Sequence, residues 1–237
     1  MRKSIVCLLL FLVNYLYGQE ITLQEEYFLL LTDLANANTY GYKTHLSDSV
    51  FDLNRGIFPS KGMREINFRQ GSLRSTNRHL DFAIFGDGFF KIILNDGTVG
   101  YTRNGEFFIN NDTNELLTIN GYRLFNSLTI LPGFVELRIN DDHSITTIYP
   151  NGEEINNGYL LIYNIDMNKL NYPRGPYFAS YQDFPPYFLY SGEAEEISHD
   201  RIYNKMLECS NVSSIAVMVR IIEISKILGM NWENYVE

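Results

Sequence analysis

Short apolar runs alternate with turn residues through the central part of the chain, from Gln70 to Phe125. Five runs have the length and the aromatic and β-branched content of strands: Phe82–Phe85, Phe89–Leu94, Val99–Thr102, Phe107–Ile109 and Leu116–Thr118. Gly-Asp-Gly, Asn-Asp-Gly and Asn-Gly sequences separate them, and such residues adopt the positive φ that tight hairpins need. The pattern predicts an antiparallel β meander.

The β pattern extends on both sides of this region. Further strands are predicted at Val135–Asn140, Ser144–Tyr149 and Gly158–Ile165, and an extended connection with one or two short strands, such as Met63–Phe68, is predicted before the meander. Four prolines and many aromatic residues in 171–190 predict an ordered loop, either a packing element or a contact surface. The β-rich domain is expected to span residues 43–200, with its core meander at 70–125.

Helical periodicity begins before the β-rich domain, between Ile21 and Asn38. The apolar positions of an amphipathic helix of four or five turns are Leu23, Tyr27, Leu30, Leu31 and Leu34. Thr22 and Glu25 have the spacing of a capping box at its start. Gly41 is expected to provide the turn at its C-terminal end.

The longest predicted helix lies near the other end, at Asn211–Trp232. Its first apolar stripe comprises Val212, Ile215, Ala216, Val219 and Ile222, and its second comprises Val217, Ile221, Ile224 and Leu228. Two apolar faces call for two packing partners. A core helix of a single globule would show the same pattern, but the N-terminal helix is too short to cover both stripes.

The first residues have the parts of a secretory signal. Arg2 and Lys3 precede an apolar run from Ile5 to Val13, and Gly18 precedes a polar segment. The run is shorter than the roughly 20 residues a membrane-spanning helix needs. We expect residues 1–18 to be removed, although a retained packing helix would show a similar run.

The net charge and the cysteine content make some functions and some sources of stability improbable. The net charge is −9, and removal of residues 1–18, which hold two basic residues and no acidic one, makes it −11. A chain this acidic repels phosphate, which disfavours a nucleic-acid partner. Without Cys7, the single remaining thiol, Cys209, leaves no internal disulfide, so stability must come from packing.

No group of residues has the spacing of a catalytic or metal site. The four histidines are scattered singly, and no Gly-x-Ser-x-Gly elbow is present. Asp81 and Asp87 could in principle form an acid/base pair as in glycosidases, but Asp87 lies between two glycines, which indicates a turn residue. Asn110, Asp112 and Asn114 lack the closing residues of a calcium loop. We therefore predict no enzyme activity, no metal and no cofactor.

Three separate motifs resemble flagellar basal-body rod and hook proteins. The first is Leu34-Ala-Asn36-Ala-Asn38-Thr-Tyr-Gly41-Tyr-Lys43. The second comprises Gln70-Gly71-Ser-Leu73, Leu80-Asp81-Phe-Ala-Ile84, Gly86-Asp-Gly-Phe-Phe90 and Tyr101-Thr-Arg103-Asn-Gly105, and the third is Leu207-Glu-Cys-Ser210-Asn211-Val212. Thr32-Asp33 replaces the Asn-Asn pair of the first motif.

The resemblance covers roughly residues 30–230 and implies a mainly β fold with terminal α-helices. In that family the terminal helices, here expected within 19–42 and 201–237, pair and pack with neighbouring subunits into a tube around an export channel. It implies a structural subunit of the basal-body rod, exported to the periplasmic side, whose partners are other rod and hook subunits. The implied interface residues are Leu34, Asn36, Asn38, Gly41, Asn211, Val212, Ile215, Val217, Val219, Ile221, Ile222, Ile224 and Leu228. A secreted β-rich binding module, or a paralogue that no longer polymerises, is the alternative.

Overall fold

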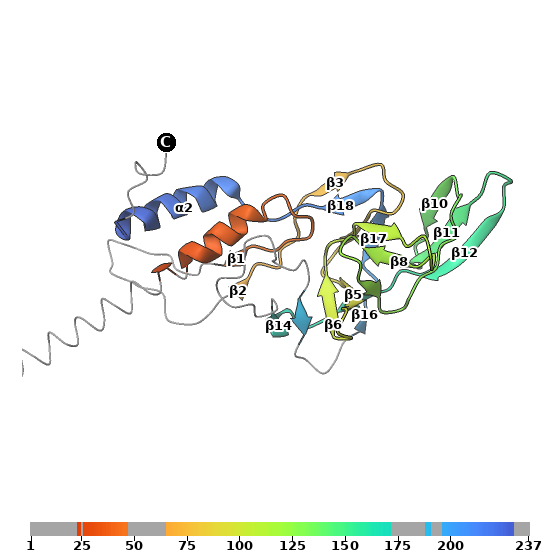
Figure 1. The fold of residues 1–237 in the computed structure, drawn as a ribbon, viewed down its shortest axis with the longest axis horizontal. Helices are drawn as coiled ribbons and strands as arrows, with labels where there is room; N and C mark the ends of the chain where they lie inside the picture. The colour runs from red at the N-terminus through yellow and green to blue at the C-terminus, as the bar shows by residue number, and fades with distance from the viewer. Residues whose placement is uncertain (1–22, 25, 47–64, 172–187, 191–195, 230–237) are drawn as a thin grey trace, which may run out of the picture. The chain divides into compact units, whose positions relative to one another are not determined.

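The computed structural model describes residues 23–24, 26–46, 65–171, 188–190 and 196–229 (Figure 1). The chain divides into two compact units. We call residues 1–37, 44–67 and 212–237 the helical unit, and residues 38–43 and 68–211 the β unit. The signal-like segment at 1–18, the capping box, and most of the aromatic loop lie outside the described residues.

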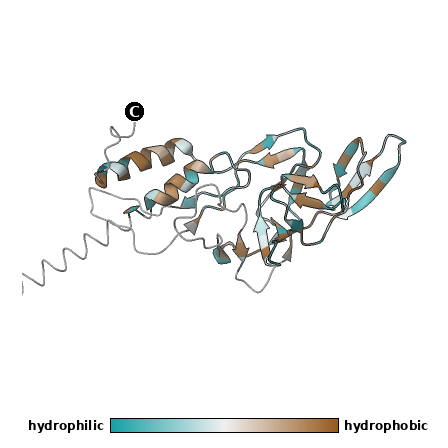
Figure 2. Cartoon of the chain, viewed as in Figure 1, coloured by the Kyte–Doolittle hydropathy of each residue, from teal (hydrophilic) through white to brown (hydrophobic). Residues whose placement is uncertain are grey.

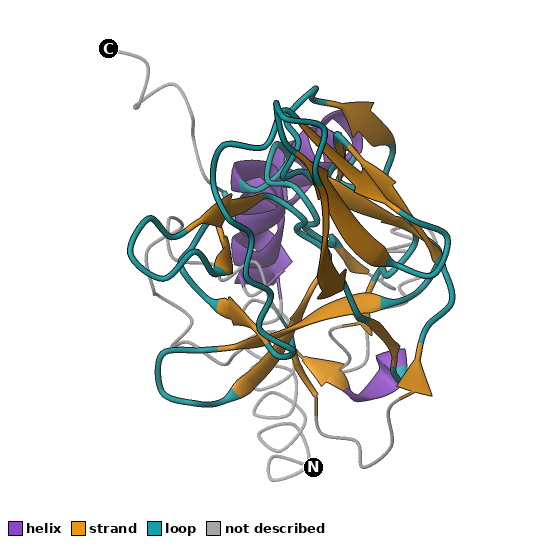
Figure 3. Ribbon diagram, turned by 90° about the vertical axis from the view of Figure 1, so that its right-hand side faces the viewer, coloured by secondary structure: helices purple, strands orange, loops and turns teal. Residues whose placement is uncertain are grey.

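All five strands predicted for the centre of the chain are present in the β unit. They are β4 (Phe82–Phe85), β5 (Phe89–Ile93), β6 (Val99–Thr102), β7 (Phe107–Ile109) and β8 (Leu116–Thr118). Strands β5 to β8 belong to an antiparallel sheet of seven strands. The other three strands are β9 (Arg123–Leu124), β13 (Ile162–Asn164) and β16 (Glu196–Ile197). Six of the seven lie in the order β16-β13-β5-β9-β8-β7, and the seventh, β6, pairs with β5. Figure 3 shows these strands in orange, joined by teal loops.

The meander prediction is right for the β5–β6 and β7–β8 pairs and wrong for the rest of the pairing. Strand β9 lies between β5 and β8, and β4 leaves this sheet to pair with β17 (Arg201–Asn204). Three consecutive residues of β4, Phe82 to Ile84, are fully buried, which is typical of a strand covered on both faces. Turn residues determine where the chain reverses. The partner of a strand that is buried on both faces depends instead on packing against a segment distant in the sequence.

A second sheet follows the first along the chain. It consists of β10 (Glu136–Ile139), β11 (Ser144–Ile148) and β12 (Glu154–Tyr159), paired antiparallel in that order. The first two strands were predicted. The third prediction, Gly158–Ile165, merged the end of β12 with β13, because Gly158 has a φ of +98° and the chain changes sheets after it.

Short strand pairs complete the fold. In the β unit, β3 (Leu73–Ser75) pairs with β18 (Met206–Glu208), and β14 (Leu170–Asn171) follows the 3-10 helix η1 (Met167–Lys169) and pairs with β15 (Leu189–Tyr190). In the helical unit, β1 (His45–Leu46) pairs with β2 (Glu65–Ile66), within the extended connection that the sequence predicts.

One hydrophobic core holds the β unit together. Its buried residues come from both larger sheets and from β4 and β17: Phe82, Ile84, Phe90, Ile92, Leu94, Phe107, Leu116, Leu124, Leu128, Ile130, Leu137, Ile145, Leu160, Ile162 and Ile202. Phe107 stacks edge-on against Phe90, with ring centroids 5.3 Å apart. A core of this kind stabilises the unit without any disulfide.

The N-terminal helix ends earlier than predicted, and α2 is shorter than predicted. The N-terminal helix is described at 23–24 and 26–35, and α2 spans Ser214–Ile227. Residues 201–208, which the sequence analysis assigned to the C-terminal helical segment, instead form β17 and β18. Helix α2 ends where Gly229 takes a φ of +67°, the usual left-handed helix stop. Neither described helix combines the length and apolar content that crossing a bilayer requires.

Candidate assembly site

The two terminal helices pack against each other in the helical unit (Figure 1). Residues Val217, Ile221 and Ile224 of the second stripe are buried against the N-terminal helix. The buried partners on that helix are Leu23, Tyr27 and Leu30, and Leu31, Leu34, Val212 and Leu228 pack at the margin. The second stripe of α2 therefore has its packing partner within the same chain.

The first stripe of α2 is largely exposed. Ile215 is 79% exposed, Val219 52% and Ile222 48%. Met218, between them, is 48% exposed, so the four side chains form a continuous apolar strip along one face of the helix. Figure 2 shows hydrophobic residues in brown on α2. Apolar side chains gathered in this way on an exposed helix face are typical of an interaction site.

A partly buried ion pair joins the two helices. Nε of Arg220 lies 2.8 Å from Oε1 of Glu26, and its Nη2 lies 3.2 Å from Oε2. Glu223 approaches a third guanidinium nitrogen at 3.2 Å. Burial lowers the pKa of Arg220, but the hydrogen bonds and charges of Glu26 and Glu223 raise it by more, and the net shift is upward. The bidentate geometry fixes the register of the helix pair.

The N-terminal helix ends in a polar network around Asp33. Its buried carboxylate accepts hydrogen bonds from Thr44 Oγ1 at 2.6 Å and from the backbone N–H of His45, and His45 Nδ1 lies 2.8 Å from Oδ1. The Asn36 side chain donates to the carbonyl of Thr32 at 2.9 Å. The departure from the family motif at Asp33 therefore ties strand β1 to the helix.

Three other predicted residues lie in the β unit. Asn38 is exposed in a turn. Gly41 has a φ of +71°, but the helix has already ended at residue 35, so it is not the helix cap that the sequence predicted. A Cβ at this position would overlap the backbone nitrogen of Asn104, so Gly41 permits a close approach between two backbones. The backbone N–H of Asn211 donates to the Tyr42 carbonyl at 3.4 Å.

Beside Gly41 the β unit contains a buried charge cluster of Lys43, Arg103 and Glu208. Nζ of Lys43 lies 2.6 Å from Oε1 of Glu208, and Nε of Arg103 lies 2.7 Å from Oε2. All three side chains are at most 2% exposed. The Gly71 N–H also donates to Oε1 of Glu208, at 2.8 Å. Each of the three sequence motifs contributes to this cluster.

Arg103 and Lys43 also bind backbone carbonyls around the cluster. The Arg103 guanidinium donates to the carbonyls of Gly86 and Gly88 and to that of Ile84 at 3.2 Å. Nζ of Lys43 donates to the carbonyl of Arg69 at 2.9 Å. Burial lowers the pKa of Lys43 more than the Glu208 carboxylate raises it, and Arg103 lowers it further. The cluster carries two cations and one anion.

The sequence analysis did not single out these three charged residues as functional. A signal was present, because each follows a residue that is buried in the structure: Tyr42, Thr102 and Leu207. A charged residue within such a segment must find a partner. The sequence alone did not indicate which charges pair.

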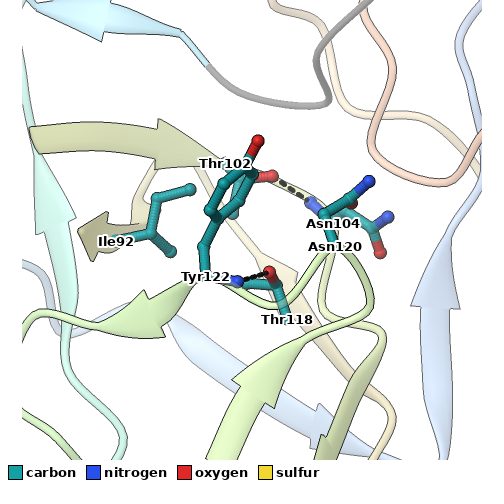
Figure 4. Close-up of a pocket in the computed structure, with 6 residues that line it drawn as sticks. All are labelled: Ile92, Thr102, Asn104, Thr118, Asn120 and Tyr122. Atoms are coloured by element: carbon teal, nitrogen blue, oxygen red, sulfur yellow. Dashed lines mark hydrogen bonds between the residues drawn. The ribbon is translucent and has the colours of Figure 1, made fainter. Parts of the chain in front are cut away.

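The described residues form a small cavity and a larger, open surface hollow of about 330 Å³ around Asn95, Glu115 and Arg123. The small cavity has a volume of about 10 Å³. Figure 4 shows the residues that line it: Ile92, Thr102, Asn104, Thr118, Asn120 and Tyr122. Such a volume holds about one water molecule. Asp81 is buried beside Arg78, at 3.0 Å, whereas Asp87 is exposed. Among the described residues, no group of three His, Cys, Asp or Glu side chains could hold a metal ion.

Comparison with known proteins extends the resemblance. Residues 83–147 match the family described as the flagellar hook protein FlgE/F/G D1 domain. The chain is 32% identical to the flagellar basal-body rod protein FlgG of Borreliella burgdorferi over 45% of the chain and 48% of that protein. FlgG of Buchnera aphidicola (Schizaphis graminum) is 29% identical over 57% of the chain and 60% of that protein.

The matches to these two relatives thus span less than two thirds of their lengths. A third, FlgG of Buchnera aphidicola (Baizongia pistaciae), is 28% identical over 86% of both chains. The family match lies within the β unit, where the charge cluster joins the three motifs. Together these matches support membership in the flagellar basal-body rod and hook protein family.

Proposed function

We propose that this protein is a structural subunit of the bacterial flagellar basal-body rod and that it assembles through its terminal helices. The observation that carries the proposal is the exposed first stripe of α2, Ile215, Val219 and Ile222. The second stripe is already covered by the N-terminal helix of the same chain. The first stripe is then the face through which one subunit contacts the next.

The partners are other rod and hook subunits, which form a tube of packed helix pairs. The names of the relatives support this role, because they are rod proteins. Coiled-coil packing supports the geometry, because a helix with two apolar stripes at heptad-like steps can contact two neighbouring helices. The repeating unit is the pair of terminal helices within one chain, and the first stripe of α2 contacts the next helix pair.

A periplasmic location accompanies this role. The signal-like segment at residues 1–18 supports export across the cytoplasmic membrane. Mass spectrometry of the protein in isolated basal bodies tests the removal of this segment. A peptide that contains intact residues 1–20 would exclude cleavage after Gly18.

Val219→Asp tests the assembly role. A carboxylate in a contact between subunits loses its water without gaining a partner, so assembly and motility should be lost. Because Val219 is half exposed, the free energy of unfolding of the monomer should change by no more than about 0.5 kcal/mol. Electron microscopy of basal bodies and chemical unfolding of the purified chain give the two readouts.

Val135→Asp is the matched control. Val135 is 57% exposed in the β unit, so the same chemical change is made at a similar exposure but outside α2. This variant should assemble normally. If Val219→Asp also builds rods and supports swimming, the proposal is wrong, and a secreted β-rich module that does not polymerise becomes the better description.

A further inference from the structure

Two segments that lead to the terminal helices run side by side in the β unit. The backbone N–H of Gly41 donates to the carbonyl of Glu208 at 2.8 Å, and that of Asn211 donates to the carbonyl of Tyr42. Residues 41–43 follow the N-terminal helix, and residues 207–211 precede α2. The β unit therefore holds its first and last segments together.

Regular strand pairing of the last segment is short. Strand β18 pairs with β3 over three residues, and Cys209 N–H adds one bond to the carbonyl of Ser72 at 2.8 Å. Gly71 lies so close to Cys209 that a Cβ would overlap the Cys209 carbonyl oxygen. Short pairs of this kind open easily unless other contacts hold them.

The Glu208 carboxylate supplies such contacts from three directions. It accepts hydrogen bonds from Lys43 on the first segment, from Gly71 next to the last segment, and from Arg103 directly after β6. Lys43 also donates to the Arg69 carbonyl, and Asn211 Nδ2 donates to the same carbonyl at 2.8 Å. Displacement of the last segment would leave the buried cations Lys43 and Arg103 without their counterion, which is strongly unfavourable, and displacement of the first would break the hydrogen bond from Lys43 to Glu208.

We propose that Glu208 and Lys43 are positioning residues that hold the two segments at a fixed separation, so that both terminal helices start from defined points. This inference rests on the proposed assembly role. A subunit that packs both helices against neighbours needs these two starting points fixed. Loosening the segments should therefore impair assembly even when the core of the β unit stays intact.

Lys43→Met is the test variant, because it keeps the neutral Arg103–Glu208 pair and the length of the side chain. Hydrogen exchange on the purified full-length chain should become roughly tenfold faster at the amides of Gly41, Cys209 and Asn211. Amides bonded across β10 and β11 should exchange as in the wild type. In cells, the number of assembled rods should fall severalfold, because the helices no longer start from fixed points.

Two controls separate positioning from general stability. Lys169→Met makes the same change at an exposed lysine, 3.9 Å from Asp166, and should alter neither readout. Leu137→Ala removes core volume far from the cluster in sequence, and should speed exchange throughout the β unit while rods still form. Loss of rods in Leu137→Ala to the same extent would overturn the positioning role.

The inference and the proposed function fail in different ways. If Lys43→Met leaves the three amides unchanged, or speeds them while rods form normally, the positioning role is wrong although the assembly role stands. If Val219→Asp builds normal rods, the assembly role is wrong whatever Lys43→Met does. Glu208→Gln provides a second variant, which should produce a larger change in the same three amides than Lys43→Met.

Discussion

Nζ of Lys43 and Oε1 of Glu208 lie 2.6 Å apart, although 165 positions separate the two residues in the sequence. Arg103 contacts the other oxygen of the same carboxylate, so one anion pairs with two buried cations. The three residues are therefore not equivalent. Loss of either cation leaves a neutral pair, whereas loss of the anion leaves two unpaired cations.

We expect Glu208→Gln to destabilise the β unit more than Lys43→Met does. Removing one partner of a buried ion pair costs about 3–5 kcal/mol when the other charge stays buried, and Glu208→Gln leaves two such charges. Lys43→Met should cost about 1–3 kcal/mol, mainly through the lost hydrogen bonds. Urea unfolding monitored by near-ultraviolet circular dichroism measures both. An equal loss of unfolding free energy in the two variants would contradict the expectation that Glu208→Gln leaves two unpaired cations.

The stabilising effect of Lys43 should depend on pH. Burial lowers the pKa of Lys43 in the folded protein below its ordinary value of 10.5, despite the opposing effect of Glu208. Between the lowered pKa and 10.5, the unfolded chain binds more protons at this site than the folded chain does. The contribution of Lys43 to the free energy of unfolding should therefore rise with pH through this window.

The difference in the free energy of unfolding between the wild type and Lys43→Met isolates this effect, because the other lysines and the tyrosines titrate in both proteins. Urea unfolding at a series of pH values from 8 to about 10.5 should show the wild type gaining stability relative to the variant. A difference that falls over this window would mean that Glu208 raises the pKa of Lys43 more than burial lowers it.

Local sequence signals predicted the strands well and their partners poorly. Each of the runs from Phe82 to Thr118 is a strand, because alternation, β-branched residues and turn glycines act over a few positions. The pairing of Phe82–Phe85 with Arg201–Asn204 depends on burial against a segment more than 100 positions away. Neither strand carries a signal for the other.

The candidate site shows the same division. Helical spacing separated the two stripes of α2, because their periodicity lies within one segment. It could not show which stripe the N-terminal helix covers, since that depends on how two distant helices pack. Asp33 illustrates the limit, because helical spacing places it between the apolar positions of the helix, whereas the structure buries it against Thr44 and His45.

Gly41→Ala should destabilise the β unit markedly. Gly41 combines a φ of +71° with close packing against the backbone of Arg103 and Asn104, so a methyl group meets both strain and overlap. Gly97 is the matched control, because its φ is +82° and a Cβ there would meet no atom within 4 Å. Gly97→Ala should cost about 1 kcal/mol, the usual price of a left-handed alanine.

Gly41→Ala should cost at least about 2–3 kcal/mol more than the control, because the overlapping atoms belong to the backbone and cannot move independently. Thermal unfolding of the two purified variants measures the difference. Similar unfolding temperatures for Gly41→Ala and Gly97→Ala would mean that residues 41–43 can shift away from Arg103. That result would also argue against the positioning role of Lys43.

The Arg220–Glu26 pair should couple the terminal helices in the isolated chain. Both side chains are at least four-fifths buried, and the pair is bidentate. A double-mutant cycle with Glu26→Gln and Arg220→Gln should therefore give a coupling free energy of about 1–2 kcal/mol, above the range for exposed pairs. The cycle is measured by helical circular dichroism during urea unfolding.

The Arg138–Glu136 pair is the control, because it is also bidentate but is about half exposed on β10. Water and salt screen the exposed pair, so its coupling free energy should be much smaller than that of Arg220 and Glu26. Added salt should reduce it further. The helix pair should hold its coupling when salt is added, since its carboxylate is shielded by both helices. If the two cycles give equal couplings with equal salt dependence, Arg220 and Glu26 do not fix the register of the helices before assembly, and neighbouring subunits must set it instead.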